Sequence, residues 1–236
     1  MALIGTGVLA IWNGIAPNGT NSGAEADFLA WHMREHIPER VAVPGFLRGR
    51  RYAAADGHPK YFNFYEADTA DVFTSPAYLA RLNDPTPWTR RVVAHFTDTS
   101  RTPCDVAATR GLGEGSWIEA IRLELPNSDR FAAAAERELL PALCAAPGIV
   151  AAHLLRGRTE TRTVTAETKL RGQPDQLAGW ILLVEAVDAA MLRDLRARKL
   201  TDAALQALGA QGIERGLYAL QFSLSRAELD RAAAST

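Results

Sequence analysis

The stretch Phe28–Gly45, FLAWHMREHIPERVAVPG, decides the fold, because the chain repeats it at Phe131–Gly148, FAAAAERELLPALCAAPG. A shift of 103 residues aligns the two stretches without a gap, and eight of the eighteen positions are identical. The identical positions include the first phenylalanine and the final Pro-Gly pair. Self-similarity of this kind predicts a duplicated structural unit.

The two copies differ at their histidines. His32 and His36 of the first copy correspond to Ala135 and Leu139 of the second. Residues that both copies keep are those that the fold requires, and the histidines are not among them. We therefore predict that the first half carries a specialised site.

Length and composition limit the class of protein. A chain of 236 residues suffices for two domains of about 100 residues each. A net charge of −1 offers no broad field for nucleic acid or anionic lipid, and no apolar run approaches the roughly 20 residues of a membrane helix. The two cysteines are too few for a disulfide framework. We expect a cytoplasmic protein with no nucleic-acid or membrane partner.

The same order of elements is predicted in both halves. In the first half we expect strands at Val8–Trp12, Phe46–Tyr52, Tyr61–Ala67 and Arg90–Thr97, with helices at Ala24–Ile37 and Ser75–Leu82. In the second half we expect strands at Trp117–Leu125, Ile149–Arg158, Gly179–Val187 and Leu217–Leu224, with helices at Asp129–Ala146 and Ala189–Leu208. Pro38 is expected to end the first helix. The order β-α-β-β-α-β is that of a ferredoxin-like unit.

The helices of such a unit cover one sheet face, so a second sheet must bury the other. We therefore predict an α+β fold in which two tandem ferredoxin-like repeats pack their antiparallel sheets face to face as an intramolecular α/β barrel. Residues 1–103 would form the first repeat with the candidate site. Residues 104–116 would form a linker, because Ser100–Ser116 is rich in Gly, Thr and Pro. Residues 117–236 would form a degenerate, mainly structural second repeat, which contains a longer polar segment at Thr159–Gln176.

A helical wheel places the two histidines beside the buried face of the first helix. At about 100° per residue, Leu29 and Ile37 lie on the apolar stripe and Trp31 points more to solvent. His32 and His36 fall on the flank of that stripe. A flanking position contacts both the core and any cleft that opens beside the helix.

Two strands supply candidate partners for the histidines. Along Tyr61–Ala67, side chains alternate, so Asn63 and Tyr65 share one face. We expect the opposite, phenylalanine face to pack on the helices and the Asn63/Tyr65 face to line the space between the sheets. In the strand predicted at Arg90–Thr97, His95 would face the same space. A wet interface between the sheets, without a ligand, explains these residues equally well.

The pattern does not indicate a metal or a nucleotide cofactor. His32 and His36 are spaced i, i+4, close enough to share a metal, but that spacing alone is a weak signal and no cysteine or HExxH motif accompanies them. Gly111–Gly115, GLGEG, lacks the spacing and the βαβ context of a dinucleotide loop. We predict no metal and no cofactor.

The first helix also resembles a known family. The segment Phe28–Arg40, followed by Pro44-Gly45-Phe46, is similar to the helix and turn of EthD-like, stress-responsive and monooxygenase-like domains of the dimeric α/β-barrel superfamily. Those domains often carry a Trp and a His-x-Pro near this helix end, and Trp31, His36 and Pro38 match them here. The resemblance implies a site between sheet and helices. The superfamily includes cofactor-free monooxygenases, isomerases, cyclases, haem enzymes and proteins without known activity.

Two functions remain open on the sequence. The first is an enzyme, independent of nucleotide cofactors, that acts on a small aromatic or unsaturated carbonyl compound. His36 would be its acid/base, while His32, Asn63, Tyr65 and His95 would bind the substrate. The second is a non-catalytic module for small-molecule binding or dimerisation. Substrate, reaction and oligomeric state, a homodimer included, stay undecided.

Overall fold

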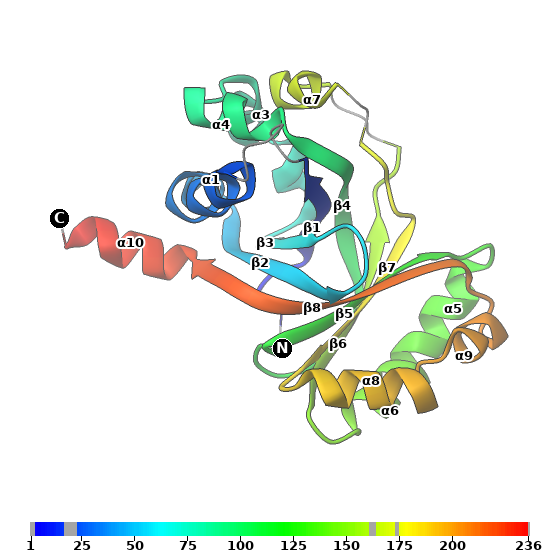
Figure 1. The fold of residues 1–236 in the computed structure, drawn as a ribbon. Coiled ribbons are helices and arrows are strands. Elements are labelled where there is room, and N and C mark those ends of the chain that lie inside the picture. The colour runs from blue at the N-terminus through cyan, green and yellow to red at the C-terminus, as the bar shows by residue number, and fades with distance from the viewer. Residues whose placement is uncertain (1–2, 17–22, 161–163, 173–174, 236) are drawn as a thin grey trace.

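The computed structural model describes residues 3–16, 23–160, 164–172 and 175–235, and these residues form a closed barrel of antiparallel strands (Figure 1). The strands are β1 Gly7–Ile15, β2 Phe46–Asp56, β3 Tyr61–Ala67, β4 Phe96–Gly111, β5 Trp117–Glu124, β6 Ile149–Gly157, β7 Trp180–Ala186 and β8 Gln211–Ser225. Their order around the barrel is β1-β3-β2-β8-β5-β7-β6-β4. Each half therefore contributes a four-stranded sheet, and the last strand of each half closes the barrel by pairing with the second strand of the other.

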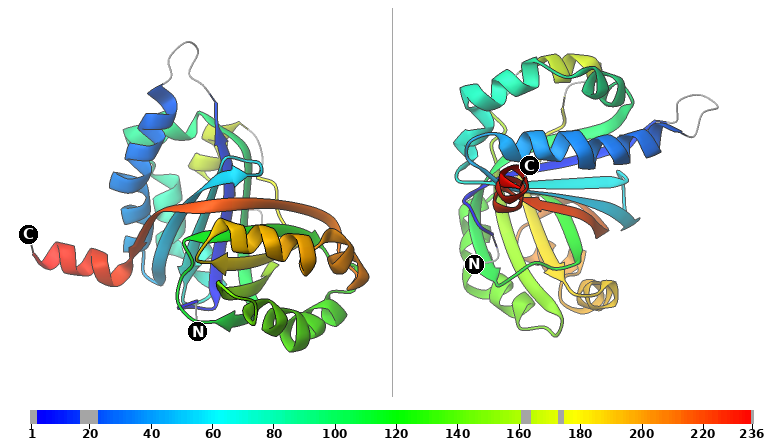
Figure 2. Two further views of the ribbon diagram at one scale, coloured as in Figure 1. Left: turned by 60° about the horizontal axis from the view of Figure 1, so that its bottom comes forward. Right: turned by 90° about the vertical axis from the view of Figure 1, so that its left-hand side faces the viewer.

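Helices cover the outside of each sheet. The first half carries α1 Gly23–Trp31, η1 His32–His36, α2 Ile37–Ala42, η2 Ala70–Thr74, α3 Pro76–Asn83 and α4 Pro87–Val93. The second half carries α5 Ser128–Ala134, η3 Ala135–Leu139, α6 Leu140–Cys144, α7 Ala166–Arg171, α8 Ala189–Arg198 and α9 Asp202–Ala207, and α10 Arg226–Ala234 follows. The two helical layers lie on different sides of the barrel (Figures 1 and 2). The predicted α+β fold of two ferredoxin-like repeats in an intramolecular barrel is confirmed.

The last strand of the first half lies later in the chain than predicted. Arg90–Val93 belong to α4, because Pro87 starts that helix and the Thr86 side chain caps it by accepting from the Thr89 N–H. The predicted strand at Arg90–Thr97 is therefore wrong. β4 instead runs through residues 104–111, which we expected to belong to a linker, and pairs there with β6.

The duplicated helix contains a π-helical turn in both copies. His32–His36 and Ala135–Leu139, again 103 residues apart, form five-residue π-turns in which the Ile37 N–H bonds to the His32 carbonyl. Pro38 follows the first turn, and a proline cannot donate to the carbonyl four residues back and collides with it in a regular helix. The wider turn accommodates the proline, so the helix continues to Ala42 instead of ending at Pro38.

The π-turn also changes which side chains are buried. Trp31, expected toward solvent, is 0% exposed, and His32 and His36 are 2% and 9% exposed. Leu29, expected on the buried stripe, is only partly buried. The helical wheel misplaced these side chains because it assumed 3.6 residues per turn throughout. Each residue of a π-turn rotates the chain by a smaller angle about the helix axis.

The two faces of β3 are the reverse of the prediction. Phe62 and Phe64 pack inside the barrel with residues of both sheets, whereas Tyr65 packs with Ile37 on the helix side. The barrel interior is filled by large apolar side chains, among them Trp12, Phe62 and Phe64. Asn63 and Tyr65 consequently face the same layer as the histidines of η1.

The polar segment of the second repeat reaches over the first. Its described part includes α7, which packs on α3 and α4 of the first half (Figure 1). Gln176, at its end, forms a parallel bridge with Ser100 of β4. Through α7, the second repeat therefore also covers part of the first repeat.

Among the described residues, no helix is long and apolar enough to cross a membrane. The C-terminal α10 projects from the end of β8, away from the barrel (Figures 1 and 2).

Candidate functional site

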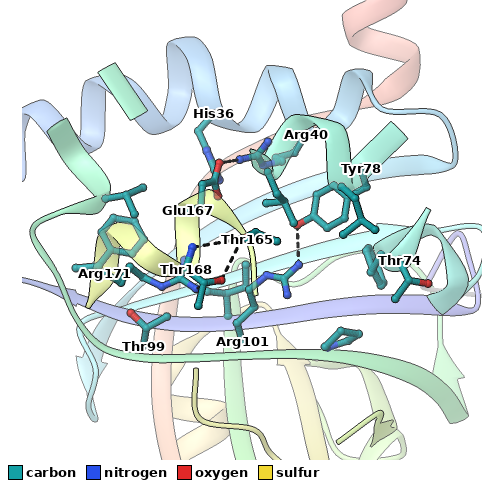
Figure 3. Close-up of a pocket in the computed structure, with 17 residues that line it drawn as sticks. His36, Arg40, Thr74, Tyr78, Thr99, Arg101, Thr165, Glu167, Thr168 and Arg171 are labelled. Carbon is teal, nitrogen blue, oxygen red and sulfur yellow. Dashed lines mark hydrogen bonds and ion pairs between the residues drawn. The ribbon is translucent and has the colours of Figure 1, made fainter. Parts of the chain in front are cut away.

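A small cavity lies between the helices and the sheet of the first half, under α7 (Figure 3). Its volume is about 60 Å³, room for about two water molecules. Its polar lining comprises His36, Arg40, Thr74, Tyr78, Thr99, Arg101, Thr165, Glu167, Thr168 and Arg171. Its apolar lining comprises Ile11, Phe73, Leu79, Leu82, Val93, Phe96 and Pro103. The site therefore joins an apolar wall to a cluster of guanidinium groups.

Arg40 and Glu167 connect the two repeats across the cavity. The Arg40 guanidinium of α2 forms an ion pair with the Glu167 carboxylate of α7, and both side chains are buried. Figure 3 shows this pair next to His36 at one edge of the cavity. The contact holds α7 against the first-half helices.

Tyr78 lies between two guanidinium groups. Its hydroxyl accepts a hydrogen bond from Arg101 Nη2 at 2.9 Å, and the Arg101 guanidinium lies 5.6 Å from the centre of its ring. The Arg40 guanidinium lies 5.8 Å from the same ring centre. Such positions favour cation–π attraction and fix the phenol at the cavity wall.

His36 is neutral in this environment. Burial and the nearby Arg40 guanidinium hold the pKa of His36 well below its ordinary 6.5, and burial with Arg51 does the same for the pKa of His32. The His36 ring lies 4.2 Å from the Trp31 ring centre and 5.3 Å from that of His32. A neutral imidazole at a cavity wall can accept a proton.

Trp31 is itself held from the α4 side. Its Nε1 donates to Thr89 Oγ1 at 3.1 Å, and the Thr89 hydroxyl donates to the Glu35 carboxylate at 3.2 Å. The hydroxyl of Thr86 donates to the same carboxylate at 2.5 Å. This network keeps the indole against His36.

The predicted site residues separate into three groups. His36 borders the cavity, and His32 lies behind it. Asn63 and Tyr65 are buried under the helix without lining the cavity, and Asn63 Nδ2 donates to Asn13 Oδ1 at 2.8 Å. His95 lies in the turn after α4, so the strand position predicted for it is wrong.

Several buried polar atoms in this layer have no hydrogen-bond partner among the described residues: His32 Nδ1, His36 Nδ1, Arg40 Nη1, Asn63 Oδ1 and Tyr65 Oη. Buried polar groups are normally paired, so a group of unpaired ones calls for a partner that the described residues do not supply. These five lie in the first repeat, and Arg171 Nε of α7, at the same cavity, is also without a partner among the described residues.

Arg40 was overlooked although the repeat marks it. The same shift of 103 residues pairs Arg40 with Leu143, so the polar positions 32, 36 and 40 all become apolar in the second copy. Comparison of the two copies does not mark Glu167 or Arg171, because α7 has no counterpart in the first repeat. Arg101 lies in Ser100–Ser116, the stretch rich in Gly, Thr and Pro on which the linker prediction was based.

The residues present do not fit a haem, which some proteins of this fold class use. A cavity of about 60 Å³ is far below the roughly 300–1,000 Å³ of pockets that enclose larger organic ligands. Among the residues described, no group of three or more His, Cys, Asp or Glu side chains is placed to hold a metal ion.

The closed barrel of two ferredoxin-like repeats with helices outside is shared with several solved structures. The structure is similar to that of an anthrone oxidase-like protein, with 14% identity, a TM-score of 0.61 and 94% of each chain covered. It is also similar to a proposed monooxygenase from Lactobacillus acidophilus, with 10% identity, a TM-score of 0.55 and coverage of 94% of this chain and 97% of that one.

A third similar structure is that of a proposed chlorite dismutase, with 14% identity, a TM-score of 0.54 and coverage of 97% and 99% of the two chains. No family model and no curated protein matches the sequence. At these identities the similarity shows the fold.

Proposed function

We propose that this protein is an enzyme that removes a proton from a small aromatic or unsaturated carbonyl compound, without a nucleotide cofactor. The observation that carries the proposal is a buried His36, whose Nδ1 has no hydrogen-bond partner among the described residues, at the wall of a cavity that also contains guanidinium groups. The second repeat, which keeps the fold, lacks His36 and Arg40. A homodimeric state and a cytoplasmic location stay predictions.

The chemistry follows from the charges around the cavity. The His36 imidazole would accept a proton from a carbon next to a carbonyl group, and the electron pair of that C–H bond would move onto the carbonyl oxygen. Arg101 would stabilise the resulting enolate oxygen, because its positive charge lies at the same cavity and its hydrogen-bond partner is the Tyr78 hydroxyl. Trp31 would keep the imidazole in place.

The enolate can react in either of two ways. Return of the proton to a different carbon gives an isomer. Reaction of an activated CH2 group with dioxygen gives a carbonyl and one molecule of water. The similar structures include an oxidase-like protein and a proposed monooxygenase, which supports the reaction with dioxygen.

Anthrone, a ketone with an acidic CH2 group, is the probe, and because its three rings exceed the cavity of about 60 Å³, its binding requires part of the cavity wall to move. In deuterated buffer without dioxygen, the protein should exchange the CH2 protons, and with dioxygen it should consume the gas. His36→Leu, the residue of the second copy, should lower both rates by about 10²–10⁴-fold. His58→Gln, at an exposed position with a side chain 74% accessible, is the matched control and should leave them unchanged.

Exchange at an unchanged rate in His36→Leu would overturn the catalytic role. Binding of anthrone to the wild-type protein with neither exchange nor dioxygen consumption would favour the alternative, a non-catalytic binding module.

A further inference from the structure

The cavity contains more positive charge than its own lining neutralises. Arg40, Arg101 and Arg171 line it, and Glu167 is the lining carboxylate. Arg171 pairs with Asp175 at 2.6 Å, and Arg40 pairs with Glu167. Within the described ranges, Arg101 forms no ion pair, and its hydrogen-bond partner is the Tyr78 hydroxyl. Arg101, which is partly buried, therefore adds a positive charge that no ion pair compensates directly, and an anion bound beside it would do so.

Arg40 offers an unused donor to such an anion. The residue is 2% exposed, its Nη2 contacts Glu167, and its Nη1 has no hydrogen-bond partner within the part of the chain described. A free carboxylate can engage both nitrogens of one guanidinium side by side, which is stronger than a single contact. The Glu167 carboxylate, tethered to α7, contacts only one of them.

The remaining wall suits an aromatic body. Phe73, Leu79, Leu82, Val93 and Phe96 line the cavity beside the guanidinium groups. The present volume of about 60 Å³ holds no aromatic ring with a carboxylate, so a ligand must displace part of the wall. Glu167 is the lining group whose departure both enlarges the cavity and frees a cation.

We propose that the cavity binds an aromatic carboxylate, and that the Glu167 side chain takes the place of the ligand's carboxylate on Arg40 when no ligand is bound. The proposal deepens the proposed function, on which it rests for the position of the site, and names its substrate class. Exchange of one carboxylate for another keeps Arg40 paired in both states. It also couples ligand entry to release of α7 from the first repeat.

The probe is 1-naphthoate, compared with its uncharged analogue 1-naphthamide, by isothermal titration calorimetry. The wild-type protein should bind 1-naphthoate at least about tenfold more tightly than the amide, because a charged hydrogen-bonded pair is lost in the amide. Glu167→Gln should bind 1-naphthoate more tightly than wild type, again by about tenfold or more. Glu39→Gln, which removes a carboxylate on α2 outside the cavity lining, should bind as wild type does.

Arg40→Leu should abolish the preference for the carboxylate. This variant introduces the residue that the second copy packs at position 143, where it is 1% exposed, so a leucine is compatible with this helix. Arg101→Gln tests the anion site without touching the Arg40–Glu167 pair and should weaken binding of 1-naphthoate. Circular dichroism confirms that each variant is folded.

Equal affinity for 1-naphthoate and 1-naphthamide, or weaker binding by Glu167→Gln, overturns the proposal. Its failure is distinguishable from that of the proposed reaction. If the carboxylate preference holds while His36→Leu keeps full exchange activity, the anion site stands and the reaction fails. If exchange depends on His36 while the two probes bind equally, the reaction stands and the anion site fails.

Discussion

At the scale of single residues, His32 and His36 make the folded state sensitive to acid. Both are buried in neutral form, with pKa values well below 6.5 because of burial and the neighbouring arginines. Below about pH 6.5 the unfolded chain therefore binds more protons than the folded one, and stability falls with falling pH. The loss continues until the pH reaches the lowered pKa values.

We predict that replacing both histidines by their second-copy counterparts, His32→Ala and His36→Leu, flattens this dependence. Between about pH 6.5 and pH 5 the wild-type free energy of unfolding should fall by up to about 1.4 kcal/mol per pH unit for each histidine. Urea denaturation across this range measures the slope. The exposed His58→Gln variant should keep the wild-type slope, and an unchanged slope in the double variant would contradict the assignment.

An aromatic carboxylate should offset part of the pKa shift of His36. Burial is the largest cause of the lowered pKa and the Arg40 guanidinium adds to it, so a further anion in the cavity stabilises the imidazolium and raises the pKa in part. Binding of 1-naphthoate near neutral pH should therefore take up protons. Calorimetry in two buffers of different ionisation enthalpy detects the uptake, and His36→Leu should remove it.

At the scale of elements, the π-turn is what brings the site residues onto one face. His32, His36 and Arg40 are each four residues apart, and all are buried. In a regular helix a spacing of four drifts around the axis by about 40° at each step. The wider turn at His32–His36 reduces the drift, so that the three side chains face the sheet together.

The duplicated prolines allow a matched test of this turn. Pro38→Ala and Pro141→Ala remove the same constraint from the same π-turn in the two copies. We expect similar shifts in Tm for both. Only Pro38→Ala should weaken the site, by up to about 100-fold in the exchange rate, because small displacements of a catalytic group are costly. Equal exchange rates in the two variants would show that the π-turn does not position His36.

At the scale of the whole molecule, buried ion pairs join the repeats inside the barrel. Arg50 of β2 donates to Glu66 of β3 and to Glu185 of β7, both at 3.0 Å. His153 of β6 lies 3.3 Å from Glu185 and corresponds to Arg50 under the shift of 103 residues. Each repeat therefore contributes a basic residue and a glutamate, and Arg50 bridges the two.

We predict that Arg50→Met lowers the free energy of unfolding by roughly 3–5 kcal/mol, because it removes the buried cation that Glu66 and Glu185 share and leaves each carboxylate with one fewer basic partner. Burial opposes ionisation of Glu185, but Arg50, His153 and the Gly115 N–H lower its pKa to about 2. Its contribution is present above about pH 4.5 and is lost as the pH falls toward 2. Chemical denaturation at several pH values measures both effects.

The control for Arg50→Met is Glu214→Gln, which removes the partially exposed pair with Arg122 and should cost less than about 1 kcal/mol. Similar losses in the two variants would show that the interior pairs do not hold the repeats together.

The sequence by itself determined the duplication, the order of elements and the residues that distinguish the first copy. These features depend on local residue spacing and on side-chain chemistry. Comparison of the two copies in one chain separates the residues that both keep from those that differ. It also marked Arg40 through Leu143. Two predictions, the strand at Arg90–Thr97 and the orientation of β3, failed for the same reason. Local periodicity does not tell whether an apolar side chain packs inside the barrel or against the outer helices.

Only the tertiary structure decided what completes the site. Glu167 reaches Arg40 across 127 residues, from a helix that the first repeat lacks, and Arg101 arrives on a strand shared by both sheets. Hydrophobic periodicity describes one helix or strand at a time, so it does not predict contacts between elements that lie far apart in the sequence. The barrel closes the two sheets, brings α7 over the first repeat, and places the charges of three separate elements around His36.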